Sequence, residues 1–141
     1  MPAPRRRAVI PRRRPAPTAD VVLGVPAEAE YLRAIRMAVA ALATQQQFNY
    51  DDVEDLRRAV DELCYAFVVA TAPGNRLRVL AWLDPTEITV QVCLERPPEF
   101  EPTTSELSER IIANLVDEYF LGPLDHHGVV GIVIKRAGTP R

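Results

Sequence analysis

Residues 51–70 of this chain read DDVEDLRRAVDELCYAFVVA, and this stretch decides the fold. Its apolar residues recur at spacings of three and four, which on an α-helix gathers them into one stripe. The stripe consists of Val53, Leu56, Val60, Leu63 and Phe67. Acidic residues crowd the first turns, where carboxylates cap free N–H groups and complement the positive end of the helix dipole. The stretch therefore predicts an amphipathic helix with one face in a core.

A second strip of this helix lies beside the apolar stripe and contains Ala59, Glu62 and Ala66. The helical period places these three side chains next to the core-facing residues rather than opposite them. We therefore expect the Glu62 carboxylate at the edge of the core. An ordinary helix-surface carboxylate without chemistry is the alternative interpretation of Glu62.

The composition is typical of one globular domain, because 141 residues with 48% hydrophobic and 26% charged side chains can bury a sizeable core. Apolar runs stay well below the roughly 18 residues of a transmembrane helix. The arginine-rich N-terminus is not followed by a hydrophobic segment or a cleavage site. These features predict a cytoplasmic protein without a membrane segment.

The net charge of −2 hides a division within the chain. Residues 1–17 contain six arginines, five prolines and no acidic residue, which predicts a disordered tail. The rest of the chain carries 11 basic against 19 acidic side chains, a net charge of −8. We expect an ordered domain over 18–136 and a short C-terminal tail over 137–141. The acidic domain favours a basic protein partner over nucleic acid, which only the tail would suit.

Upstream of the central helix, residues 21–25 form a β-rich run that Pro26 closes, and residues 27–47 keep a helical period. Downstream, the breaker at 72–75 changes the period from 3.6 to 2. Two alternating strands, 77–83 and 88–94, then predict an antiparallel hairpin.

A proline-rich loop over 96–102 follows this hairpin. Thr103 with Glu106 resembles a capping box, which predicts a helix that ends near Asp117. Residues 118–121 and 129–135 predict a second hairpin. The expected order is β-α-α-β-β-α-β-β, a two-layer α+β fold with three helices on one face of a mostly antiparallel sheet. Trp82 is a candidate to cover the other face of that sheet.

The segment Asp55–Cys64, DLRRAVDELC, between an amphipathic helix and a β-hairpin, resembles the N-box helix of the anti-sigma factor serine kinases of the sigma-B and sporulation type. Asn114–Glu118 looks like the last helix of that family running into its fourth strand. The resemblance covers roughly residues 20–136 and is greatest to divergent actinobacterial members. It implies the Bergerat fold of the histidine-kinase-like ATPases.

The resemblance also assigns expected site residues. Glu62 matches the family glutamate that orients or deprotonates the attacking group. The family asparagine that holds Mg²⁺ four residues later is Ala66 here, and a methyl group cannot bind a hard cation. We expect the floor of a decayed site to be packed or empty at position 66, and an asparagine there to cost little stability.

The segment after the second strand of the first hairpin also departs from the family pattern. Where the family has an Asp-x-Gly-x-Gly turn that contacts the nucleotide, this chain reads ERPPEF over Glu95–Phe100. Glycine is absent between Gly74 and Gly122, so the glycine-rich phosphate lid is missing as well. Glu95 could replace the adenine-reading aspartate. Because phosphoryl transfer depends on positioning and neutralising the nucleotide, we expect a degenerate ATP site, with ATP and Mg²⁺ as cofactors only if that site functions.

What the resemblance implies is an anti-sigma factor that sequesters an alternative sigma factor and is released by an antagonist of the STAS type. An active ATP-dependent serine kinase that phosphorylates the antagonist is the alternative. A nucleic-acid-binding protein acting through the arginine-rich tail is a third interpretation. A homodimer is expected from the resemblance alone.

Other candidate residues carry weaker signals. His126 and His127, beside Asp125, lack a metal-site spacing, so no metal is expected there. Cys64 and Cys93 are expected to be buried thiols rather than a disulfide. Ser105 and Ser108 have no spaced histidine or aspartate partner and are not expected to be nucleophiles.

Overall fold

The computed structural model describes residues 18–124 and 128–138. The elements follow the predicted order: β1 (Val21–Pro26), α1 (Leu32–Gln45), α2 (Tyr50–Val68), β2 (Arg76–Asp84), β3 (Glu87–Leu94), α3 (Glu106–Leu115), β4 (Glu118–Pro123) and β5 (Val129–Arg136). A 3-10 turn, η1 (Ala29–Tyr31), replaces the first turn of the predicted 27–47 helix. The predictions for His126 and His127, and for a tail over residues 1–17, concern residues outside these ranges.

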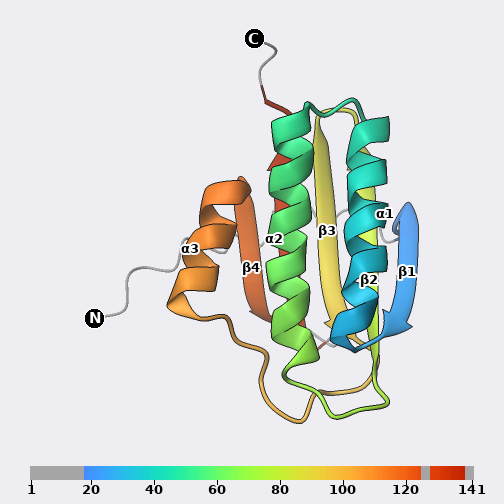
Figure 1. Ribbon diagram of the computed structural model, residues 1–141, viewed down its shortest axis with the longest axis vertical. Helices are drawn as coiled ribbons and strands as arrows, with labels where there is room; N and C mark the ends of the chain where they lie inside the picture. The colour runs from blue at the N-terminus through green and yellow to red at the C-terminus, as the bar shows by residue number, and fades with distance from the viewer. Residues whose placement is uncertain (1–17, 125–127, 139–141) are drawn as a thin grey trace.

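The five strands form one sheet in the order β1-β2-β3-β5-β4, and every neighbouring pair is antiparallel. The three helices lie side by side on one face of this sheet (Figure 1). The molecule therefore has the predicted two-layer α+β architecture, and α2 runs along the middle of the helical layer.

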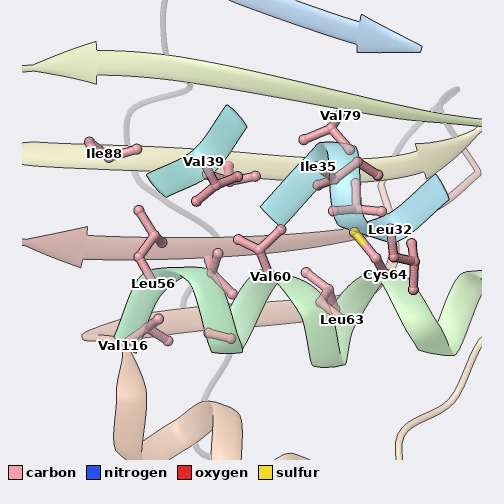
Figure 2. Packing of buried hydrophobic residues seen from close by; sticks show 14 of the residues in the cluster. Leu32, Ile35, Val39, Leu56, Val60, Leu63, Cys64, Val79, Ile88 and Val116 are labelled. Carbon is pink, nitrogen blue, oxygen red and sulfur yellow. The ribbon is translucent and has the colours of Figure 1, made fainter. Parts of the chain in front are cut away.

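The core lies between the helices and the sheet (Figure 2). The predicted stripe of α2 is buried, with Leu56, Val60, Leu63 and Phe67 at 0% exposure. Alternate residues of β2 and β3 belong to the same core as this stripe, as the period-2 pattern predicted. Helix α2 approaches β5 so closely that a Cβ added to Gly131 would lie 2.6 Å from a methyl carbon of Leu63. Glycine at this position lets the helix pack directly on the strand.

The opposite face of the sheet carries a second apolar cluster of Val130, Ile132 and Ile134, which are at most 6% exposed. Phe120, Leu124 and Cys93 pack against it. Trp82 is half-buried, and the alternation of β2 places it on this same face.

Two helix starts differ from the predicted caps. Asn49 caps α2, since its side-chain oxygen accepts a hydrogen bond from the Asp52 amide at 2.8 Å. In α3 the cap is Ser105, which accepts from the Ser108 amide at 3.0 Å, so the predicted capping box at Thr103 is wrong. Ser105 offers the same oxygen in the extended conformation that a cap requires, and α3 therefore begins later than expected.

Lys135, on β5, links the C-terminal end of α3 to the first turns of α2. Its ammonium group donates to the Leu115 carbonyl at 2.8 Å, at the end of α3. The same group lies 3.4 Å from an Asp55 carboxylate oxygen and 3.7 Å from one of Asp52, both in α2. The side chain is only 12% exposed, so these charges are poorly screened by water. This contact fixes α3 beside α2.

Candidate functional site

The candidate site is the junction between the middle of α2 and the first turn of α3, where Glu62 lies. Glu62 is half-buried, in agreement with its predicted position at the edge of the core. Its carboxylate accepts a hydrogen bond from the Ser108 hydroxyl at 2.9 Å. The Ser108 amide is at the same time bound by the Ser105 cap. Glu62 is therefore held by a group from a helix 46 residues away in the chain.

Ala66 lies one turn after Glu62 on α2 and is only 4% exposed. Ala59, one turn before Glu62, is 0% exposed. The strip of 59, 62 and 66 was predicted to border the core, and at its two alanines it lies inside the core instead. We therefore revise the expectation that asparagine costs little at position 66, because it would replace a buried methyl group with a larger polar side chain.

The segment between β3 and α3 covers the C-terminal part of α2. The Phe100 amide donates to the Ala70 carbonyl at 2.9 Å, just after the end of the helix. Pro102 is buried. This segment includes the place where the family pattern has its glycine turn, and here one of its backbone N–H groups donates to a carbonyl just after the end of α2.

Asn75 anchors the start of that segment, and it is only 6% exposed. Its side-chain oxygen accepts from the amides of Arg76 at 2.8 Å and Arg96 at 3.0 Å. Its side-chain nitrogen donates to the Arg96 carbonyl and the Thr71 hydroxyl, both at 2.9 Å. All hydrogen-bonding positions near the amide plane are thus in use. Sequence reasoning treated Asn75 only as part of a turn, because its partner Arg96 lies 21 residues away in the chain.

Glu95 lies apart from the contacts of Glu62. Its amide donates to the Arg76 carbonyl at 2.9 Å, which extends the pairing of β2 with β3. Its exposed carboxylate lies 3.9 Å from the Arg76 guanidinium. The structure brings Glu62 together with Ser108, whereas Glu95 has its partner on β2.

The remaining candidates are placed as follows. Cys64 and Cys93 are free thiols, buried and half-buried respectively, and burial raises the pKa of both. Among residues 18–124 and 128–138, no three or more His, Cys, Asp or Glu side chains gather in a way that could hold a metal ion. In the same ranges, no helix is both long enough and apolar enough to span a membrane.

Ser108 is the site residue that sequence reasoning missed. It was considered only as a nucleophile, and its pairing with Glu62 depends on how α3 packs against α2. The two residues are 46 positions apart, so the sequence held no local signal for the pairing.

Comparison with known proteins agrees with this architecture. Residues 25–133 match the model of the histidine kinase-like ATPase domain. The serine-protein kinase RsbW of Bacillus thuringiensis (strain Al Hakam) is 41% identical over 44 residues, which are 31% of this chain and 28% of that protein. The RsbW proteins of Bacillus cereus (strain B4264) and Bacillus anthracis (strain A0248) match to the same extent. The chain thus aligns with less than a third of these relatives, while the family model covers most of the chain. The protein belongs to the histidine kinase-like ATPase family, has its Bergerat fold, and is related to the anti-sigma regulatory kinases within it.

Proposed function

We propose that this protein is an anti-sigma factor that binds and sequesters an alternative sigma factor without turning over ATP. A regulatory protein of the sigma-B partner-switching type is the function that its relationship to RsbW supports. The further step, that binding rather than phosphorylation is its activity, rests on the α2–α3 junction.

The single observation that carries this step is the hydrogen bond between Glu62 and Ser108. It engages one oxygen of the carboxylate that would act on the attacking group. One turn later, the buried methyl group of Ala66 supplies no oxygen ligand for Mg²⁺. The chain has no glycine between Gly74 and Gly122 that would let the backbone approach phosphates. These residues do not fit Mg²⁺-ATP.

Charge supports a protein partner. Residues 18–141, which follow the arginine-rich tail, carry a net charge of −8, and a DNA-binding partner such as a sigma factor has basic surfaces that contact phosphates. Complementary charge accelerates association and disfavours acidic partners. In this proposal an antagonist of the STAS type releases the sigma factor by competing for the protein, which acts as a cytoplasmic homodimer in a stress response.

The proposal is tested by binding the full chain to each purified sigma factor of the source organism at low salt. We expect tight binding to one alternative sigma factor, unchanged when ATP and Mg²⁺ are removed. Displacement by a STAS-domain protein encoded in the same genome is the second expected result. Failure of every sigma factor to bind would refute the proposal.

An active serine kinase is the second candidate, because the related proteins are named serine-protein kinases and Glu62 retains the expected position. Calorimetric titration with Mg²⁺-ATP separates the two candidates. Micromolar binding that Glu62→Gln abolishes, together with phosphate transfer to an antagonist serine, would establish the kinase instead. We expect no binding heat with Mg²⁺-ATP for wild type or for Glu62→Gln, and no phosphate transfer.

A further inference from the structure

Large apolar side chains are exposed around the same junction. Tyr65 and Val69 on α2 are 55% and 56% exposed, and Phe100 and Leu107 are 66% and 69% exposed. We call these four residues the apolar patch. Exposed apolar side chains that gather rather than scatter mark an interaction surface.

The α2 members of the patch share one side of the helix with Glu62. Tyr65 and Val69 follow Glu62 by three and seven residues, spacings that place all three on one face. The backbone of Phe100 lies close to Val69, because its amide donates to the carbonyl of Ala70, the next residue along the chain. Three patch residues therefore belong to the C-terminal end of α2: Tyr65 lies in its last turns, Val69 directly follows it, and Phe100 is bound to the residue after that.

Leu107 completes the patch from α3. The hydroxyl of Tyr119, on strand β4, donates to the Glu109 carboxylate, so that side of α3 faces the sheet. Leu107 precedes Glu109 by two residues, a rotation of about 200°, and so points away from the sheet. Its neighbour Ser108 bonds to Glu62, so Leu107 lies on the turn of α3 that contacts α2. The patch thus lies on the outer side of the helical layer.

The segment of the chain that carries Phe100 and Leu107 is acidic. Residues 95–110 contain five glutamates and two arginines, a net charge of −3. Both arginines are engaged within the protein: Arg110 lies 3.5 Å from the Glu106 carboxylate, and Arg96 donates to the Gly74 carbonyl at 2.6 Å. The glutamates at 99, 101 and 106 are exposed, whereas the exposed carboxylate of Glu95 lies 3.9 Å from the Arg76 guanidinium. The patch therefore presents an apolar centre with an acidic rim.

From this chemistry we propose that the apolar patch is a docking site for a basic amphipathic helix of the protein's partner. Such a helix presents apolar side chains at spacings of three and four, flanked by lysine or arginine. Its apolar stripe would cover the four patch residues while its basic flanks meet the acidic rim. Under the proposed function, on which the choice of partner rests, this helix belongs to the sigma factor.

Two other occupants fit this surface less well. A second copy docking patch to patch would bring two acidic rims together, which is unfavourable. The tail over 1–17 is basic, but its five prolines oppose a helix with a continuous apolar stripe.

The chain offers a matched control for the test. Tyr50 is 77% exposed at the opposite end of α2 from Tyr65, and Val22 on β1 is 56% exposed, the same as Val69. The patch variant Tyr65→Ser/Val69→Ser and the control variant Tyr50→Ser/Val22→Ser therefore have identical compositions and net charges. Because all four side chains are exposed, both variants should fold, which circular dichroism checks.

Binding is measured with the full chain and two kinds of probe: each sigma factor, and a synthetic 18-residue leucine/lysine helix with a leucine/glutamate counterpart. We expect the patch variant to bind the lysine helix and the cognate sigma factor at least about tenfold more weakly than wild type, with the control variant within about twofold. The glutamate helix should not bind. Equal affinities of the patch and control variants, or binding of the glutamate helix, would refute the docking site.

Other outcomes identify which inference fails. If no sigma factor binds but the lysine helix shows the expected pattern, the proposed function fails and the docking site stands. If a sigma factor binds both variants equally, the docking site fails and the function stands. If wild type sediments as a dimer and the patch variant alone sediments as a monomer, the patch binds a second copy. If deleting residues 1–17 raises the affinity for the lysine helix, the patch binds the tail. Either result overturns the proposal.

Discussion

Substituting Ala66 by asparagine restores the residue type that the family uses for Mg²⁺, and we expect the change to destabilise the protein without restoring nucleotide binding. Ala66 is 4% exposed, so the added carboxamide must displace packed atoms. Overpacking typically costs about 1–3 kcal/mol, and a buried amide without partners costs a similar amount. We expect a loss of about 2–4 kcal/mol in the free energy of unfolding, allowing for partial relaxation.

The matched control is Ala41→Asn, at an exposed position inside α1. It carries the same loss of helix propensity, about 0.5 kcal/mol, without the burial. Urea denaturation followed by circular dichroism measures both. With a slope of about 2 kcal/mol per molar urea, the midpoint of Ala66→Asn should lie roughly 1–2 M below wild type, and that of Ala41→Asn within about 0.3 M.

Calorimetry of Ala66→Asn with Mg²⁺-ATP gives the functional result. Without backbone donors for the phosphates, a single amide oxygen cannot hold the nucleotide, so no binding is expected. Equal stability of the two variants would show that position 66 is not packed as described. Tight ATP binding by Ala66→Asn would refute the argument that the missing glycine turn after β3 prevents nucleotide binding.

Three further changes test the packing around the site. Gly131→Ala should lower the free energy of unfolding by about 1–3 kcal/mol in urea titrations, since its Cβ would lie 2.6 Å from a methyl carbon of the buried Leu63 side chain; an unchanged midpoint would contradict this close approach. Asn75→Ala should lower the free energy of unfolding by about 2–3 kcal/mol and speed amide hydrogen exchange at Arg96, because four hydrogen bonds are lost. Unchanged exchange would show that Asn75 does not anchor the segment between β3 and α3. Burial raises the pKa of Cys64, so its thiol stays neutral in the folded state, whereas in the unfolded state it ionises above about pH 8.5. The free energy of unfolding of wild type should therefore fall by about 1.4 kcal/mol per pH unit above that value. The variant Cys64→Ala should lack this contribution.

Much of the fold was predictable from local patterns. The apolar stripe of α2 and the alternation of β2 and β3 each repeat with the period of their element, and burying one face leaves few arrangements. The breaker at 72–75 and the loop over 96–102 separated these elements correctly. Glu62 could be placed at the core edge for the same reason, since its position follows from the stripe beside it.

Tertiary packing alone decided the chemistry of the site. Ser108 meets Glu62 across 46 residues, and Asn75 holds Arg96 across 21, and neither pairing has a local signature in the sequence. The depth of Ala66 was misjudged because the helical period gives the direction of a side chain but not what packs over it. The sequence by itself determined the elements, their order and their apolar faces, because those depend on neighbouring residues. Which group meets the Glu62 carboxylate depended on how α3 packs against α2, which only the tertiary structure decides.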